Sequence, residues 1–129
     1  MTDLESRYRA YLDALNERRL DDMVHYVQDD LKYNGQAMTR LEYQEMIAAD
    51  IAATPDLFFD ARNIVTNQNW VASRIVFDCT PIKEFLGFQP NGRQISFAEH
   101  VFYRFSEGRI AEVLSVIDRA AVSQQLSQG

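Results

Sequence analysis

The spacing of apolar residues in the first half of the chain predicts three helices. One face of a helix over residues 3–18 is formed by apolar residues at helical intervals: Leu4, Tyr8, Tyr11, Leu12 and Leu15. A second, short helix is predicted over residues 20–27. The third begins at a capping box, in which the Thr39 hydroxyl and the Glu42 carboxylate each accept a hydrogen bond from the other residue's backbone N–H. It ends at Thr54-Pro55, because proline disfavours helical geometry in the residue before it.

Beyond Pro55 the pattern changes to that of strands. Segments rich in β-branched and aromatic residues predict strands over residues 57–65, 70–80, 94–105 and 110–118, and a brief strand lies earlier, over 31–34. The last two strands form a hairpin, and a loop with glycine and proline covers residues 81–93. Helices followed by an antiparallel sheet are typical of the α+β class. No repeat or linker interrupts the sequence, so we expect one domain over residues 1–129.

Composition excludes several classes of function. The 129 residues carry a net charge of −6, whereas a protein that binds the phosphate backbone of nucleic acid needs clustered positive charge. The single cysteine, Cys79, cannot form an internal disulfide and is expected to be buried packing. With only two histidines a structural zinc cluster is disfavoured, and we expect neither metal nor cofactor. The absence of a long apolar run and of a signal-peptide pattern predicts a cytoplasmic protein that has no membrane partner.

Two segments in the second half carry a family resemblance. Residues 81–95, PIKEFLGFQPNGRQI, are similar to the EF-x-G-x-x-P-x-G-[KR] loop of SnoaL-like polyketide and ester cyclases. Residues 102–118 are similar to the ending F-R-x-x-x-G-[KR]-I-x-E-x-W-x-x-x-D of the same family. The resemblance implies the cone-shaped α+β barrel of the nuclear transport factor 2-like superfamily, in which a curved sheet wraps around a pocket closed by helices. The sequence departs from the family pattern where Leu114 replaces a tryptophan and where Arg74 is followed by isoleucine in place of tryptophan.

The resemblance implies two alternative functions. The superfamily contains cyclases, isomerases, dehydratases, epoxide hydrolases and many proteins without catalytic activity, so the fold alone does not decide between them. The first alternative is a cofactor-independent lyase or isomerase, similar to polyketide cyclases, that acts on a small apolar carbonyl compound. In that case the family role of Asp118 is to remove a proton from the carbon next to the carbonyl. The second is a binding module without chemistry, which holds a hydrophobic ligand or serves dimerisation.

The hairpin turn decides whether Asp118 and His100 lie on the same face of the sheet. A two-residue turn at Glu107-Gly108 places the two side chains on opposite faces, whereas a three-residue loop over 106–108 places them on the same face. The two-residue type I′ turn needs a positive φ at both central positions, which glutamate disfavours. The three-residue loop needs a positive φ only at the glycine, where it forms a β-bulge. The sequence therefore favours the three-residue loop.

With that loop, a carboxylate and an imidazole face an apolar interior together with Phe102, Leu114 and Val116. A low dielectric raises the pKa of a carboxyl group and lowers that of an imidazole, and such groups serve acid–base catalysis. In this hypothesis Asp118 is the base and His100 orients the resulting enolate. The alternatives are that Asp118 caps the helix that follows and that His100 is an ordinary interior histidine.

Other residues are candidates for the pocket wall: Tyr11, Tyr33, Asn34, Trp70, Arg74 and Asp78. Asn34 is included because the family often has a polar residue at the end of the first strand. The tyrosines could equally be core residues, and Arg74 could form an ion pair with Asp78, two pleats along the same face. An epoxide-hydrolase site would need an arginine between two interior carboxylates. Arg74, Asp78 and Asp118 could supply these groups, but no closely spaced Arg-x-Asp motif supports that reading.

The opposite face of the last hairpin carries a row of apolar residues: Phe97, Val101, Tyr103, Val113 and Ile117. If the face of His100 and Asp118 is the interior, this row lies outside. A monomer rarely exposes an apolar patch of that size. The sequence therefore predicts a homodimer formed through the sheet.

Overall fold

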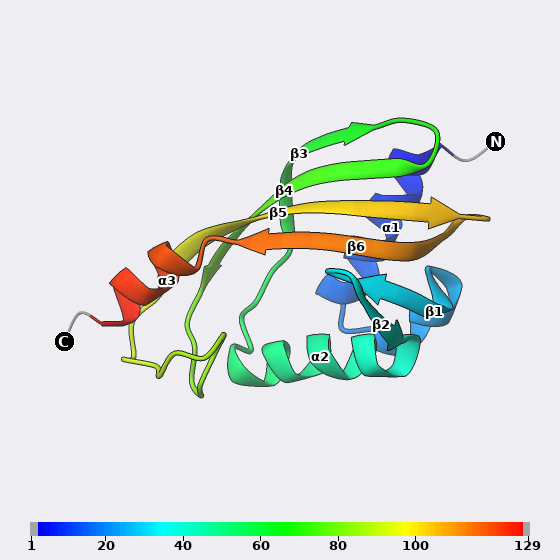
Figure 1. The fold of residues 1–129 in the computed structure, drawn as a ribbon. Helices are drawn as coiled ribbons and strands as arrows, with labels where there is room; N and C mark the ends of the chain where they lie inside the picture. The colour runs from blue at the N-terminus through cyan, green and yellow to red at the C-terminus, as the bar shows by residue number, and fades with distance from the viewer. Residues whose placement is uncertain (1–2, 128–129) are drawn as a thin grey trace.

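The computed structural model describes residues 3–127 and has a mixed α+β fold built on one curved, unclosed sheet of six strands. The order of strands across the sheet is β2-β1-β6-β5-β4-β3 (Figure 1). The strands are β1 (Val27–Tyr33), β2 (Gln36–Thr39), β3 (Asp60–Thr66), β4 (Trp70–Cys79), β5 (Ile95–Ser106) and β6 (Arg109–Ile117). The helices are α1 (Leu4–Asn16), the 3₁₀ helix η1 (Leu20–His25), α2 (Arg40–Ala53) and α3 (Arg119–Leu126).

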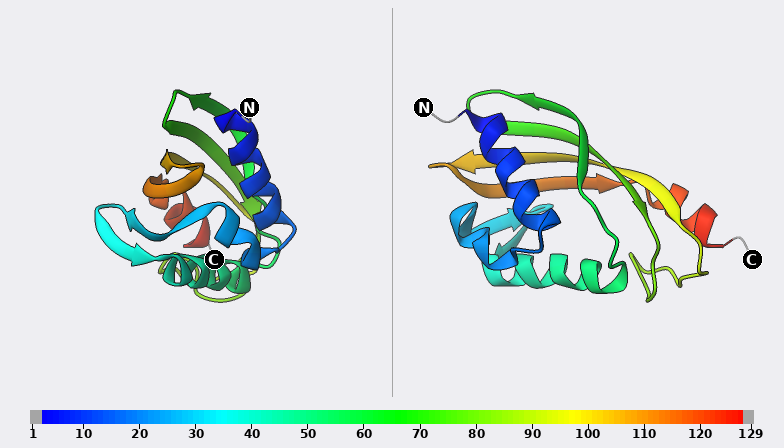
Figure 2. Two further views of the ribbon diagram at one scale, coloured as in Figure 1. Left: turned by 90° about the vertical axis from the view of Figure 1, so that its right-hand side faces the viewer. Right: turned by 180° about the vertical axis from the view of Figure 1, so that it is seen from behind.

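Helices α1 and α2 lie on the same side of the curved sheet (Figure 2). Helix α1 packs near β3 and β4, and α2 packs near β1 and β2, so the two helices cover opposite halves of the sheet. All neighbouring strands pair antiparallel except β1 and β6, which pair parallel. The expectation of an antiparallel sheet is therefore wrong for this one pair. Between residues 3 and 127, no helix has both the length and the apolar character needed to cross a membrane.

The predicted start of α2 is confirmed in detail. The Thr39 side chain accepts a hydrogen bond from the Glu42 backbone N–H at 3.1 Å, and the Thr39 N–H donates to the Glu42 carboxylate at 2.9 Å. The hairpin of β1 and β2 was not expected from the sequence. Its turn is Asn34-Gly35, with φ of 49° and 84°, and Tyr33 pairs with Gln36. An Asn-Gly pair between strands is the strongest short-range signal of a two-residue hairpin, so the information was present in the sequence.

The turn between β5 and β6 differs from the predicted one. Ser106 pairs with Arg109, and the two-residue turn has φ of 52° at Glu107 and 79° at Gly108. The predicted three-residue loop is therefore wrong. A bulge lies further along β6, where the register shifts and leaves Ala111 as the extra residue. Because the bulge shifts the register by one residue, β5 and β6 beyond it share faces as they would with the predicted three-residue loop.

With this register His100 pairs with Val116, so the two side chains lie on the same face of the sheet. Asp118 follows Val116 by two residues and belongs to that face as well. The predicted sharing of one face is thus present, but that face is the outer one. The inner face of β5 carries side chains that are at most 6% exposed: Phe97, Val101, Tyr103 and Phe105. This row faces inward because it has the greater apolar bulk, whereas the opposite row contains Ala98, His100 and Arg104.

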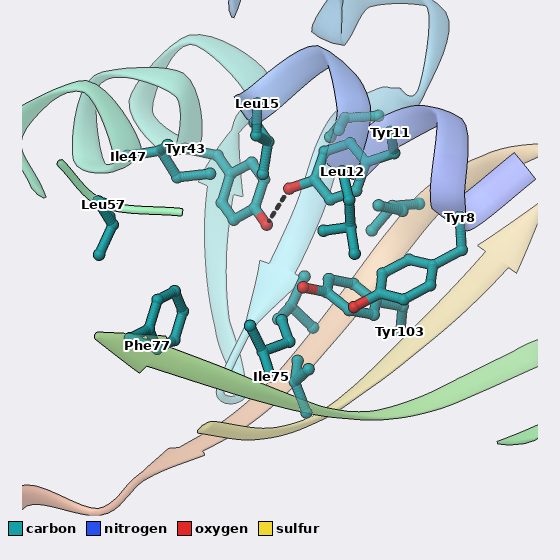
Figure 3. Packing of buried hydrophobic residues seen from close by; sticks show 14 of the residues in the cluster. Tyr8, Tyr11, Leu12, Leu15, Tyr43, Ile47, Leu57, Ile75, Phe77 and Tyr103 are labelled. Carbon is teal, nitrogen blue, oxygen red and sulfur yellow. Dashed lines mark hydrogen bonds between the residues drawn. The ribbon is translucent and has the colours of Figure 1, made fainter. Parts of the chain in front are cut away.

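The core fills the space between the inner face of the sheet and α1 and α2 (Figure 3). Tyr8 of α1 lies against Tyr103 of β5, and Tyr11 points toward Tyr43 of α2. The Tyr8 and Tyr11 ring centroids are 5.0 and 6.0 Å from that of Tyr103. Val113 is buried, and Ile117 packs against the core. The five residues expected on a dimer-forming outer face (Phe97, Val101, Tyr103, Val113 and Ile117) therefore belong to the interior, and the sequence-based assignment of the two faces is inverted.

The strained turn at Glu107 generates a prediction. Replacing Glu107 by asparagine should raise the free energy of unfolding by about 1 kcal/mol. The left-handed conformation costs most residues about this much free energy, whereas asparagine tolerates it. Urea unfolding of E107N and the wild type measures the difference. Gly108→Ala is the control and should destabilise, since Gly108 has a φ of 79°. A loss of stability in E107N would contradict the two-residue turn.

Candidate active site

A cavity of about 70 Å³ lies between the inner face of the sheet, α1, α2 and the loop that joins β4 to β5. Its walls are largely aromatic and aliphatic, including Leu15, Ile47, Leu57, Phe59, Phe77, Phe85, Leu86 and Phe97. A single water needs roughly 10–15 Å³ of such space, so the cavity has room for a few waters or a small organic group. A larger ligand requires the side chains of the wall to move outward. The residues of the described chain that line the cavity include no lysine, arginine or histidine.

Glu99 is one of two carboxyl groups in this wall. It occupies the inner position on β5 between Phe97 and Val101, and its side chain accepts a hydrogen bond from the Ser115 hydroxyl of β6. Burial raises the pKa of Glu99, the hydrogen bond from Ser115 opposes this rise, and the charge of Asp50 adds to it. Glu99 therefore keeps its proton to a higher pH than an exposed glutamate does.

Asp50 is the second carboxyl group and comes from the last turn of α2. It lies on the same helical face as Tyr43 and Ile47, which are buried. Burial raises the pKa of Asp50 to about 6. Within residues 3–127 its carboxylate forms neither a hydrogen bond nor an ion pair that would favour the charged form. Asp50 thus titrates near pH 6 while facing an apolar cavity.

Four tyrosines add hydroxyl groups to the cavity wall: Tyr11, Tyr33, Tyr43 and Tyr103. The Tyr11 and Tyr43 hydroxyl oxygens lie 2.7 Å apart (Figure 3). Burial raises the pKa of Tyr33, and the charge of Glu99 raises it further. These hydroxyl groups therefore stay protonated at neutral pH, and one proton of the Tyr11–Tyr43 pair is used in the hydrogen bond between them. Tyr11 and Tyr33 are the two residues of the sequence-predicted pocket that line this cavity.

The predicted catalytic pair lies outside the cavity. His100 and Asp118 are exposed on the outer face of the sheet, and the Asp118 side chain accepts a hydrogen bond from the Ala121 backbone N–H at 3.1 Å. Asp118 is the N-cap of α3, which was the alternative reading of this residue. The expectation that both side chains face the interior is wrong, because the larger apolar residues of β5 take the inner positions and β6 follows through its pairing with β5.

The remaining predicted pocket residues also lie elsewhere. Trp70, Phe102 and Leu114 line a shallow hollow on the outer face of the sheet, and exposed positions of that face hold Arg74, Asp78 and Val116. Among the residues that the structure describes, Arg74 and Asp78 form no ion pair with each other. Asn34 binds the backbone of β6 and does not line the cavity. Cys79 is fully buried.

Sequence reasoning missed both carboxyl groups of the cavity. The signal for Glu99 is its inward position in an alternating strand, two residues from Phe97 and from Val101. The signal for Asp50 is its helical spacing from Tyr43 and Ile47, at i+7 and i+3, which places a charge on an apolar face. A charged residue inside an apolar row is a candidate for function, because burial shifts its pKa. No cluster of three or more metal-ligating side chains occurs within residues 3–127.

The raised pKa of Asp50 predicts a pH-dependent stability. In the unfolded chain Asp50 loses its proton near pH 4, but in the folded chain it does so near pH 6, so stability falls as the pH rises through this window. Asp50→Asn should remove this loss and be more stable than the wild type by about 1–2 kcal/mol at pH 8, with little difference at pH 4. Urea unfolding at several pH values measures this. Glu45→Gln, exposed on the same helix, is the control, and an equal pH dependence in D50N and the wild type would contradict the burial of Asp50.

The model of the SnoaL-like polyketide cyclase family matches residues 5–126. A SnoaL-like polyketide cyclase from Agrobacterium tumefaciens strain C58 is 39% identical, with a TM-score of 0.93 over 98% of this chain and 100% of that one.

More distant solved structures share the fold. The putative hydroxylase AclR from Streptomyces galilaeus is 23% identical, with a TM-score of 0.81 over 98% of this chain and 96% of its own. The putative polyketide cyclase IdmH from Streptomyces antibioticus is 22% identical, with a TM-score of 0.85 over 97% of this chain and 99% of its own. No curated protein matches the sequence significantly. The family match over nearly the whole chain, together with the 39% identity, shows that the chain belongs to the SnoaL-like polyketide cyclase family.

Proposed function

We propose that the protein is a cofactor-independent acid–base catalyst of the cyclase or isomerase type, which acts on a small apolar carbonyl compound in the cavity. The observation that carries this proposal is the pair of carboxyl groups, Asp50 and Glu99, in a wall that is otherwise apolar and phenolic. Acid–base catalysis is most efficient when the pKa of the catalytic group lies near the working pH. The family membership supports the reaction class but leaves the substrate open.

The environments of the two carboxyl groups suggest different roles. A charge on Asp50 raises the pKa of Glu99, so Glu99 holds its proton to a higher pH once Asp50 has ionised. Asp50 is then the base that removes a proton from the carbon next to the carbonyl. Protonated Glu99 donates a hydrogen bond to the carbonyl oxygen and stabilises the enolate that forms. This division replaces the one expected for Asp118 and His100.

The test is proton exchange at the carbon next to a ketone. The wild type in D₂O should accelerate exchange of the α-protons of small aliphatic and aryl 1,3-diketones, followed by proton NMR. Asp50→Asn and Glu99→Gln should each slow the exchange by about 10²–10⁴-fold, the usual contribution of a general acid or base. Asp118→Asn is the matched control on the outer face and should keep the wild-type rate. Equal rates in the wild type and the D50N variant would contradict the proposal.

A non-catalytic binding module is the second candidate, and the narrow, aromatic cavity favours it. The same experiment separates the two candidates. Binding of the diketones without faster exchange, detected through ligand line broadening, would indicate the binding module. Faster exchange that depends on Asp50 would indicate the catalyst.

We further propose that the outer face of the sheet pairs with a second copy of the chain. Val65 and Val116 are each 70% exposed, Phe102 is 51% exposed, and Leu114 is 38% exposed. Val65, Phe102 and Leu114 line one hollow on that face, so the apolar groups adjoin one another. A two-fold axis, the commonest symmetry of homodimers, would bring this patch against the same patch of the second copy and cover both.

The oligomeric state tests this second proposal. Sedimentation velocity at micromolar concentration should show a dimer of the wild type and a monomer of Leu114→Asp, because a charge in the apolar hollow opposes association. Leu41→Asp is the matched control, since Leu41 is 62% exposed on α2, which lies on the inner side of the sheet. A monomeric wild type would overturn the proposal.

A further inference from the structure

The contacts that orient Glu99 begin at a residue that lies outside the cavity. The parallel pairing of β1 with β6 ends at Tyr33 and Val113, after which the chain turns away through Asn34-Gly35. Asn34 donates its backbone N–H to the Val113 carbonyl at 2.9 Å. Because its φ is 49°, the backbone of Asn34 leads into the hairpin turn and cannot continue the ladder along β6.

The side chain of Asn34 takes over the pairing. Its amide oxygen accepts a hydrogen bond from the Ser115 N–H at 2.8 Å, and its amide nitrogen donates to the Ser115 carbonyl at 3.2 Å. A side-chain amide has the same donor and acceptor groups as a peptide unit, so it extends the ladder by one residue. The backbone of β6 is thereby fixed at Ser115, the residue whose hydroxyl donates to the Glu99 carboxyl.

We infer that Asn34 is a positioning residue of the cavity, which acts through Ser115 to hold the carboxyl group of Glu99 in one orientation. This inference rests on the proposed role of Glu99 as the acid. With the Ser115 hydroxyl bound to Oε2, the proton of the neutral carboxyl is carried by Oε1, the oxygen left free for a ligand. Asn34 therefore serves the cavity from the edge of β6, without contact with the ligand.

The groups that face Glu99 are consistent with this role. The charge of Asp50 on α2 raises the pKa of Glu99, and the charge of Glu99 in turn raises the pKa of tyrosines from four elements: Tyr8 and Tyr11 of α1, Tyr33 of β1, Tyr43 of α2 and Tyr103 of β5. None of these groups carries a positive charge. The hydrogen bond from the Ser115 hydroxyl favours the charged form of Glu99 and lowers its pKa. The position of that hydroxyl therefore affects the titration of Glu99 directly.

The experiment follows the Glu99 carboxyl carbon by NMR titration of the full chain labelled with ¹³C-glutamate, assigned with the Glu99→Gln variant. Ser115→Ala should move the midpoint upward by about half a pH unit, because it removes a hydrogen bond to the charged form. Asn34→Gly should move it in the same direction, since glycine accepts the turn conformation but lacks the amide. Ser115→Thr keeps the hydroxyl and should keep the wild-type midpoint.

Asn67→Gly is the matched control. The Asn67 side chain accepts backbone hydrogen bonds from Asn69 and Trp70 in the β3–β4 turn, and its loss should change stability without moving the Glu99 midpoint. An Asn34→Gly variant that is less stable but titrates like the wild type would overturn the inference. This titration needs no substrate or turnover, so it distinguishes failure of the positioning role from failure of the proposed catalytic function.

Discussion

The burial of one row of β5 is the constraint on which the rest of the structure depends. Phe97, Val101, Tyr103 and Phe105 all point inward, and full burial of each such side chain stabilises the fold by about 1.5–3 kcal/mol. Because successive residues of a strand face opposite sides, this row also carries Glu99 inward. Turning the strand to expose one carboxyl group would expose four large apolar side chains. The chain therefore buries an acid as a consequence of burying its core.

The cost of that acid is lowered by protonation. A charged carboxylate in an apolar wall is expensive, and the group responds by holding its proton to a higher pH. Asp50 meets the same conditions from α2, which places two acids with raised pKa values on one cavity. Because the charge of Asp50 raises the pKa of Glu99, one group can accept a proton while the other still holds one to donate. The electrostatic cost of folding and the proposed chemistry thus have the same physical origin.

The outer face of the sheet has a different character because its alternate positions received smaller and charged residues. Ala98, His100 and Arg104 stand on β5 opposite the inward aromatic row. The exposed apolar residues of this face come mainly from the neighbouring strands and from Phe102. Asp118 lies at the end of this face and caps α3. The residue at the aspartate position of the family motif therefore has a structural role in this protein.

Local chemistry in the sequence determined much of the fold. The capping box at Thr39 fixes the start of α2, the stop at Pro55 fixes its end, and the α+β order of elements follows from the change in apolar period. The two rows of β5 were also readable, and the greater apolar bulk of the row from Phe97 to Phe105 favours its burial. The position of the bulge at Ala111 and the meeting of Asp50 with Glu99 were decided by tertiary structure. The reason is that both depend on how strands and helices pack together, and those contacts join residues that lie far apart along the chain.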